Sequence, residues 1–153
     1  MRLLTLLMAL LAPAALQAAD SISLQSAVFV EKLLVEPSGR NRVVLEEPKL
    51  VTPGDRLVFI LSYRNGGTAP SHNFVVTNPL PTAVAYQGSP DGQAVVSIDS
   101  GRSWGSLAQL KIKDLGGRWR SARPEDVTHV RWALAGAIPV GASGKLSFRG
   151  VVR

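Results

Sequence analysis

Cysteine is absent from this 153-residue sequence, and histidine occurs only twice, at His72 and His129. Without cysteine the chain forms no disulfide, offers no thiolate to a metal ion and has no cysteine nucleophile. The two histidines do not stand in a metal-ligand spacing such as H-x-x-x-H. A nucleophile elbow of the G-x-S-x-G type is missing too, as is a glycine-rich phosphate loop before a helix. These absences predict a protein that is not an enzyme and that binds no metal or cofactor.

Carboxylates are the remaining candidates for chemistry, and they are scattered along the chain. A calcium site formed by Asp55, Asp91 and Asp99 is conceivable, because all three are expected in loops. The chain lacks the dense D-x-D-x-D pattern that such sites show. Isolated loop carboxylates more often cap turns, and we expect these three to do so.

One long apolar run is present, and it lies at the N-terminus. Arg2 precedes the run Leu3 to Leu11, and small residues lead to Ala18-Ala19 just before Asp20. This layout is typical of a secretory signal peptide, and the run is shorter than the ~20 residues that span a bilayer. We therefore predict a signal peptide at 1–19, cleaved after Ala18 or Ala19. The mature chain 20–153 would then be periplasmic or envelope-associated, without a transmembrane segment.

Positive charge exceeds negative charge, with 17 Lys and Arg against 11 Asp and Glu. A basic balance can indicate nucleic acid or an anionic surface as partner. The positive residues are spread over the chain, and an exported protein rarely meets nucleic acid. We therefore expect an envelope protein or polysaccharide as partner, and no nucleic acid.

Alternating apolar residues and Gly/Pro turns predict strands along the whole mature chain. A long extended segment is expected at Ile22 to Val35, and a short edge strand at Val43 to Leu45, before Pro48. Arg56 to Arg64 is apolar on both faces, as in a buried strand. A hairpin is expected between this strand and one near Phe74 to Thr77. Further strands are expected near 83–86, 94–98, 128–134 and 145–152. The pattern favours one domain, an all-β, immunoglobulin-like antiparallel β-sandwich of about 7–9 strands.

A longer motif surrounds the central strand. It reads P-G-D-x-L-x-[FY]-x-[LI]-x-[YF]-x-N-x-G, followed by a strand and [DN]-P-[LV]-P. The turn residues that carry it are Pro53, Gly54, Asp55, Asn65, Gly67, Asn78, Pro79 and Pro81. This pattern, present in a single copy, resembles the bacterial "domain of unknown function 11" family, also called the conserved repeat domain. The resemblance covers roughly residues 45–153. It implies an immunoglobulin-like sandwich in an exported or cell-surface protein, with no established enzymatic activity.

A shorter motif, Ser97 to Trp104, fits the Asp-box pattern S-x-D-x-G-x-[ST]-W known from β-propeller glycosidases. In physical terms it is a hairpin turn. The Asp99 carboxylate can accept backbone N–H bonds, Gly101 permits a positive φ, and Trp104 packs over the loop. One copy cannot build a propeller, so a structural turn is expected. A carbohydrate contact by Trp104 is the alternative.

The best candidate for partner contact is Arg118-Trp119-Arg120, in a segment (114–124) expected to be an exposed loop. An exposed aromatic between two cations suits an anionic or sugar-like partner. The alternative is that Trp119 folds back onto the core. The sequence therefore predicts a non-enzymatic, exported structural or interaction module. Two other functions stay open: a carbohydrate-binding or glycan-active protein, and a subunit of a surface assembly that uses Ile22 to Val35 as an unpaired edge or swapped strand.

Overall fold

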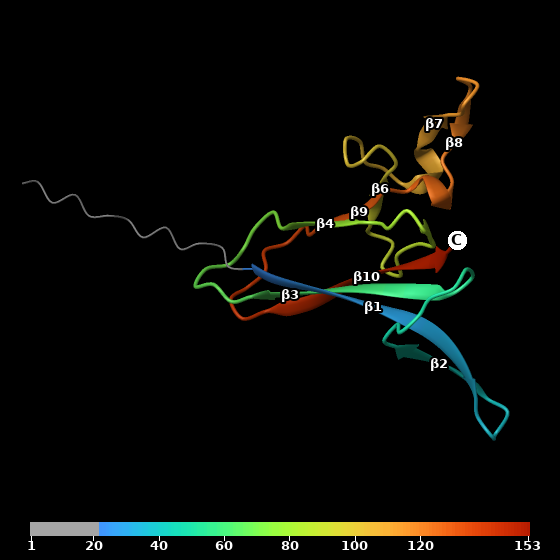
Figure 1. Ribbon diagram of the computed structural model, residues 1–153. Helices are drawn as coiled ribbons and strands as arrows, with labels where there is room; N and C mark the ends of the chain where they lie inside the picture. Colours follow the sequence, from blue (N-terminus) through green and yellow to red (C-terminus); the bar gives the residue numbers. More distant parts are fainter. Residues whose placement is uncertain (1–21) are drawn as a thin grey trace, which may run out of the picture.

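The computed structural model describes residues 22–153, so the predicted signal peptide lies outside the described residues. The described chain is all-β, with antiparallel sheets, as predicted (Figure 1). Ten strands are present in it, which is more than the 7–9 expected, because a short extra hairpin occupies the predicted loop. The strands are β1 (Ile22–Val35), β2 (Asn41–Glu46), β3 (Arg56–Asn65), β4 (Val75–Pro79), β5 (Val84–Tyr86), β6 (Val95–Ser97), β7 (Lys111–Lys113), β8 (Trp119–Ser121), β9 (His129–Ala133) and β10 (Ser143–Val152). The described chain also contains two short 3₁₀ helices, η1 (Leu107–Gln109) and η2 (Pro124–Asp126).

The larger sheet has the order β2-β1-β3-β10-β5 and is antiparallel throughout. β3 lies at its centre, between β1 and the last strand of the chain, β10. β1 is long enough to serve two partners: Ile22 to Val30 pairs with β3, and Val30 to Val35 pairs with β2. The second half of β1 and all of β2 therefore project beyond the body of the molecule as a two-stranded ribbon (Figure 1).

The smaller sheet, β4-β9-β6, packs over the larger one, and the core lies between them. Phe148 of β10 is at its centre, stacked on Phe59 of β3 with 4.4 Å between ring centroids. Trp132 of β9 reaches the same ring from the opposite sheet, at 6.0 Å. Truncating such a buried aromatic costs about 4 kcal/mol. The two sheets are therefore joined by shared aromatic packing.

The predicted faces of the strands are confirmed. Along β3, Leu57, Phe59 and Leu61 are buried toward the second sheet, and Val58 is buried on the outer face. In β9, Val130 and Trp132 are buried. β2 is an edge strand, as Pro48 suggested.

The predicted hairpin between β3 and β4 is wrong, because the two strands belong to different sheets. Both edges of β3 are taken by β1 and β10, so no edge is left for β4. The chain instead crosses from one sheet to the other. Asn65, fully buried at the end of β3, holds this crossing. Its Nδ2 donates to the carbonyls of Ala69 and Ile138, both at 2.9 Å, and its Oδ1 accepts from the N–H of Gly67 at 2.9 Å.

Within residues 22–153 the structure contains no helix of the length and hydropathy needed to span a membrane.

Candidate contact surfaces

The segment predicted as a loop around Trp119 is the β7–β8 hairpin, in which Lys113 pairs with Trp119. Its turn is closed by Asp114, whose Oδ1 accepts the N–H of Arg118 at 2.9 Å. The Trp119 side chain is 66% exposed, so it does not fold back onto the core. The Lys113 ammonium lies 5.2 Å from the centroid of the Trp119 ring, within cation–π range. The hairpin thus presents an aromatic ring with a cation beside it.

The two arginines that flank Trp119 have different surroundings. Arg118 is exposed and forms an ion pair with Asp114 at 3.3 Å. Arg120 points to the other side of β8 and binds both oxygens of Asp126 in η2, at 2.6 and 2.8 Å. Hydrogen bonds from Arg120, with the N–H of Arg123, lower the pKa of Asp126. Arg120 therefore anchors the hairpin, whereas Arg118, Trp119 and Lys113 form its exposed surface. Lys113 was missed because its partnership with Trp119 depends on strand register.

Asp99 lies in a tight turn in which its carboxylate is surrounded by donors. Its Oδ1 accepts the N–H groups of Arg102 (3.0 Å) and Ser103 (2.9 Å) and the Ser97 hydroxyl (2.7 Å). Its Oδ2 accepts the Ser103 hydroxyl at 2.6 Å. These bonds, the Ser103 hydroxyl first, hold the pKa of Asp99 far below its ordinary value. Gly101 has φ +87°, which closes the turn without strain. Asp99 is fully engaged in holding the turn.

Trp104 packs over this turn and is covered from several sides. Its Nε1 donates to the carbonyl of Gly101 at 3.0 Å. The Arg131 guanidinium lies 3.6 Å from the centroid of its ring, and His129 meets it edge-on at 6.4 Å. A sugar stacks on a free ring face, and Arg131 occupies one face of this ring. The arrangement suits a turn better than a carbohydrate contact.

The residues of the longer motif sit at turns and at the crossing between sheets. Pro53 and Gly54 (φ +95°) form the turn before β3, and the Asp55 carboxylate accepts the Thr52 N–H at 2.8 Å. That backbone bond is the main reason that the pKa of Asp55 is lowered. At the end of β4, the Asn78 side chain donates to the carbonyl of Pro79 at 2.8 Å. The carbonyl of Pro81 accepts the Val84 N–H at 2.9 Å.

The ribbon formed by β2 and the second half of β1 exposes apolar side chains that sequence reasoning did not single out. On its outer face Leu33 pairs with Val43, and Val35 and Leu45 flank this pair. Their exposed fractions are 62% for Leu33, 58% for Val43, 72% for Val35 and 45% for Leu45. Glu31 and Asn41 stand at the two ends of the row. The alternation of apolar residues along both strands was visible in the sequence. Which face of the ribbon stays exposed depends on how far the second sheet extends over the first.

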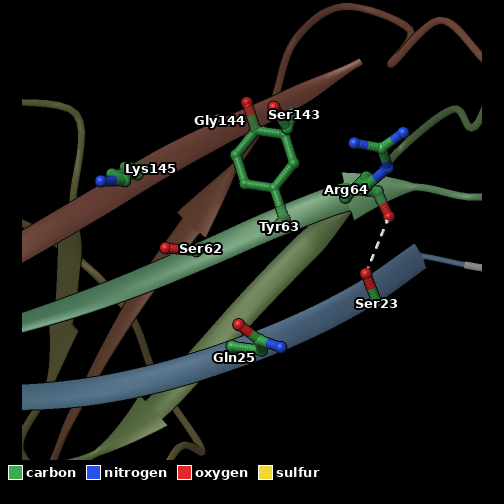
Figure 2. A pocket seen from close by; sticks show the side chains of 8 residues that line it. All are labelled: Ser23, Gln25, Ser62, Tyr63, Arg64, Ser143, Gly144 and Lys145. Atoms are coloured by element: carbon green, nitrogen blue, oxygen red, sulfur yellow. Dashed lines mark hydrogen bonds between the residues drawn. The ribbon is translucent and has the colours of Figure 1, made fainter. Parts of the chain in front are cut away.

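A polar depression of about 410 Å³ opens on β1, β3 and β10 at the end of the sheet away from the ribbon (Figure 2). Figure 2 shows Ser23 and Gln25 on β1 beside Ser62 and Arg64 on β3, with Lys145 on β10. The Ser23 hydroxyl donates to the carbonyl of Arg64 at 3.3 Å. The depression is lined by hydroxyl, amide and cationic groups, and no carboxylate is among its lining residues.

In the part of the chain that the structure describes, no three His, Asp or Glu side chains come close enough together to hold a metal ion. Family models, curated proteins and solved structures offer no match to this chain. The resemblance to the conserved repeat domain therefore stays a prediction.

Proposed function

We propose that the protein is an exported, non-enzymatic interaction module, an immunoglobulin-like sandwich of the conserved repeat type, that binds an envelope protein or polysaccharide. The observation that carries this proposal is the apolar outer face of the ribbon, Leu33, Val35, Val43 and Leu45. A contiguous exposed apolar patch with polar residues at its rim is typical of an interaction site.

The ribbon has no part in the core that would explain its apolar side chains. Val30 is the last residue of β1 that is buried in the core cluster, and no residue of β2 belongs to that cluster. Covering an exposed Leu or Val side chain contributes about 1.5–3 kcal/mol. A partner that covers the four side chains of the outer face would therefore gain substantial binding free energy there.

The exposed part of the β7–β8 hairpin supplies a second contact of different chemistry. Trp119 offers a ring face, and Lys113 and Arg118 offer positive charge beside it. An anionic or sugar-like group suits this combination. Arg120, held by Asp126, positions the hairpin. The alternative of a carbohydrate-active protein built on the Asp-box is less favoured, because Asp99 is engaged by its turn and Arg131 lies over the Trp104 ring.

The test is an affinity pull-down from a solubilised envelope extract, with a parallel glycan array. The full sequence is expressed for export and purified as the host processes it. The ribbon variant Leu33→Lys/Val43→Glu keeps an opposite-charge pair across the strands and removes the apolar contact. Val140→Lys, an exposed apolar position in a turn outside the ribbon, is the matched control.

We expect the wild type and Val140→Lys to capture one saturable partner and the ribbon variant to lose at least about tenfold in affinity, as removal of a central contact does. If Arg118→Ala/Trp119→Ala loses affinity for the partner and the ribbon variant does not, the main contact lies on the β7–β8 hairpin. If neither variant changes the binding of any envelope protein or glycan, the proposal fails.

A further inference from the structure

One edge of the larger sheet is open over a long stretch. β2 pairs with β1 only at Val30 to Val35, and no strand within residues 22–153 pairs with the same edge of β1 at Ile22 to Phe29 (Figure 1). The other sheet edges in the described chain are short or carry charge, proline or glycine. β5 and β6 have three residues each, β4 ends in a proline, and β2 carries charged residues at Arg42 and Glu46. The part of β10 that β5 leaves unpaired contains Gly144 and Lys145.

This open edge lacks the features that keep edges from pairing. Natural edge strands are protected by charged residues, proline, bulges or shortness. The segment Ile22 to Val30 reads ISLQSAVFV, without a charge, a proline or a glycine. Ser23 to Ala27 are all exposed. The stretch is therefore a ready template for another strand.

The direction of the backbone groups follows from the neighbouring hydrogen bonds. In an antiparallel strand, each residue directs both its N–H and its C=O toward the same neighbouring strand. The next residue directs both groups toward the strand on the other side. Asn65 of β3 exchanges bonds with the β10 side, donating to Ala142 and accepting from Gly141, both at 2.8 Å. The even-numbered residues of β3 therefore face β1, and their partners on β1 are the odd-numbered residues, such as Gln25 opposite Ser62.

It follows that the even-numbered residues of β1 direct their backbone groups away from β3. A bond beyond the ribbon agrees with this: Glu36, also even-numbered, donates its N–H to the carbonyl of Arg40 at 2.9 Å on the β2 side. Along the open stretch the groups without a strand partner are thus the N–H and C=O of Ile22, Leu24, Ser26 and Val28.

These four residues are arranged so that the edge is complementary to itself. In an antiparallel pair of identical strands with Gln25 opposite Gln25, Ile22 lies opposite Val28 and Leu24 opposite Ser26. Each is a hydrogen-bonded pair, so every free N–H and C=O group of both copies is used. With Ser26 opposite Ser26 instead, Ile22 would need Val30, whose groups already face β2. Of these two registers, only the Gln25 register uses all four free residues of the described edge.

We propose that two copies of this chain pair through the open edge of β1, antiparallel, with Gln25 facing Gln25 across the two-fold axis, to give one continuous sheet. The occupant is a second copy because the open stretch is uncharged and exposed, and all four of its free residues find hydrogen-bonding partners when it meets itself in this register. The absence of charge leaves no like-charge repulsion at the seam. The inference goes beyond the proposed function, since the ribbon and the hairpin are not needed for the pairing.

Disulfide trapping tests both the pairing and its register, and it is unambiguous because the chain has no cysteine of its own. Residues opposite each other in a non-hydrogen-bonded pair have Cα atoms about 4.5 Å apart, which a disulfide can bridge. Gln25→Cys should therefore give a covalent dimer under mild oxidation. With Ser23→Cys or Ala27→Cys alone, the Cα atoms of the two introduced cysteines would lie about 13 Å apart. These variants should therefore cross-link at least about tenfold more slowly. Mixing these two variants should restore cross-linking, because residue 23 lies opposite residue 27.

A second measurement needs no oxidation. Light scattering should give twice the monomer mass for the wild type and the monomer mass for Gln25→Lys or Gln25→Glu, since like charges would then meet. An equimolar mixture of the two charged variants should recover the dimer. A wild type that stays monomeric, cross-linking that is equal at all positions, or preferential trapping by Ser26→Cys would overturn the proposal. The ribbon variant Leu33→Lys/Val43→Glu should still cross-link through Cys introduced at position 25, which separates this inference from the proposed function.

Discussion

At the scale of single residues, a few polar side chains inside or beside the core decide how the chain is routed. Asn65 bonds backbone groups of three residues in two segments, and the Asp99 carboxylate accepts hydrogen bonds from the donors of its own turn. Both roles depend on a short side chain with a fixed set of donors and acceptors. Each residue can therefore be tested by a substitution that removes or alters that set.

Asn65→Ala should lower the free energy of unfolding by about 3 kcal/mol, because three hydrogen bonds are lost. The part-buried N–H of Gly67 and carbonyl of Ala69 lose their partner, and the Ile138 carbonyl keeps only the Ser71 N–H. Urea denaturation followed by circular dichroism measures the change. Asn78→Ala is the control, since its side chain only donates to the neighbouring Pro79 carbonyl on the surface. Equal effects of the two substitutions would contradict the role given to Asn65.

Asp99→Asn should destabilise the protein at neutral pH and make its stability less sensitive to acid. The pKa of Asp99 is lowered in the folded state, so its stabilising effect is complete above the unfolded pKa of about 3.9 and is lost as the pH falls below that value. The difference in thermal midpoint between wild type and variant should therefore shrink between pH 5 and pH 2 or so. A difference that stays constant over this range would show that the carboxylate charge is not what holds the turn.

At the scale of elements, the packing of β10 depends on two glycines, one facing a side chain of β3 and the other a side chain of β5. A Cβ on Gly144 would overlap the hydroxyl and ring of Tyr63, which is itself held against Phe74 at 5.7 Å. A Cβ on Gly150 would overlap the Val84 side chain of β5. The glycines thus let β10 lie flat between its two neighbours.

Gly144→Ala should cost about 2 kcal/mol, the usual range for overpacking. Most of this loss should disappear in the background Tyr63→Leu, because the clashing ring is then absent. A double-mutant cycle measured by urea denaturation gives the coupling free energy, expected to exceed about 1 kcal/mol. Gly136→Ala, which has open space around the added methyl group, should be neutral. Additive effects of the Gly144 and Tyr63 substitutions would exclude the clash.

The elements themselves were largely predictable from the sequence, and their pairing was not. Alternation was sufficient along Ile22 to Val35, and a short apolar run between two turns was sufficient along Arg56 to Arg64. The partner of β3 could not be inferred from parity, since a turn such as Asn65-Gly66-Gly67 can lead to the same sheet or across to the other. The exposure of the ribbon was missed for a related reason. The exposure of the ribbon depends on where the second sheet ends, and no local sequence pattern predicts that position.

At the scale of the whole molecule, the core draws on both sheets at once. Phe148 and Phe59 belong to one sheet and Trp132 to the other, and the three rings are in contact range. Neither sheet buries its apolar face without the other. The described chain should therefore behave as one cooperative unit.

We expect urea unfolding to be a single transition with the same midpoint for far-ultraviolet circular dichroism and for tryptophan fluorescence. A variant with Trp104→Phe and Trp119→Phe leaves the buried Trp132 as the only tryptophan, and its fluorescence reports the contact between the sheets. A fluorescence transition that precedes loss of the dichroism signal would mean that the sheets separate before they unfold, against this expectation.

The central place of β3 has a consequence for the order in which the protein can fold. β3 pairs with β10 (Ser143–Val152), although the two strands are far apart in the sequence. Phe148, for instance, lies opposite Phe59. Contacts between such distant parts of a sequence make folding slow. A chain that emerges N-terminus first cannot complete its central sheet until Ser143–Val152 has emerged. If the protein is exported, as proposed above, this delay would favour an unfolded chain during translocation and folding after it.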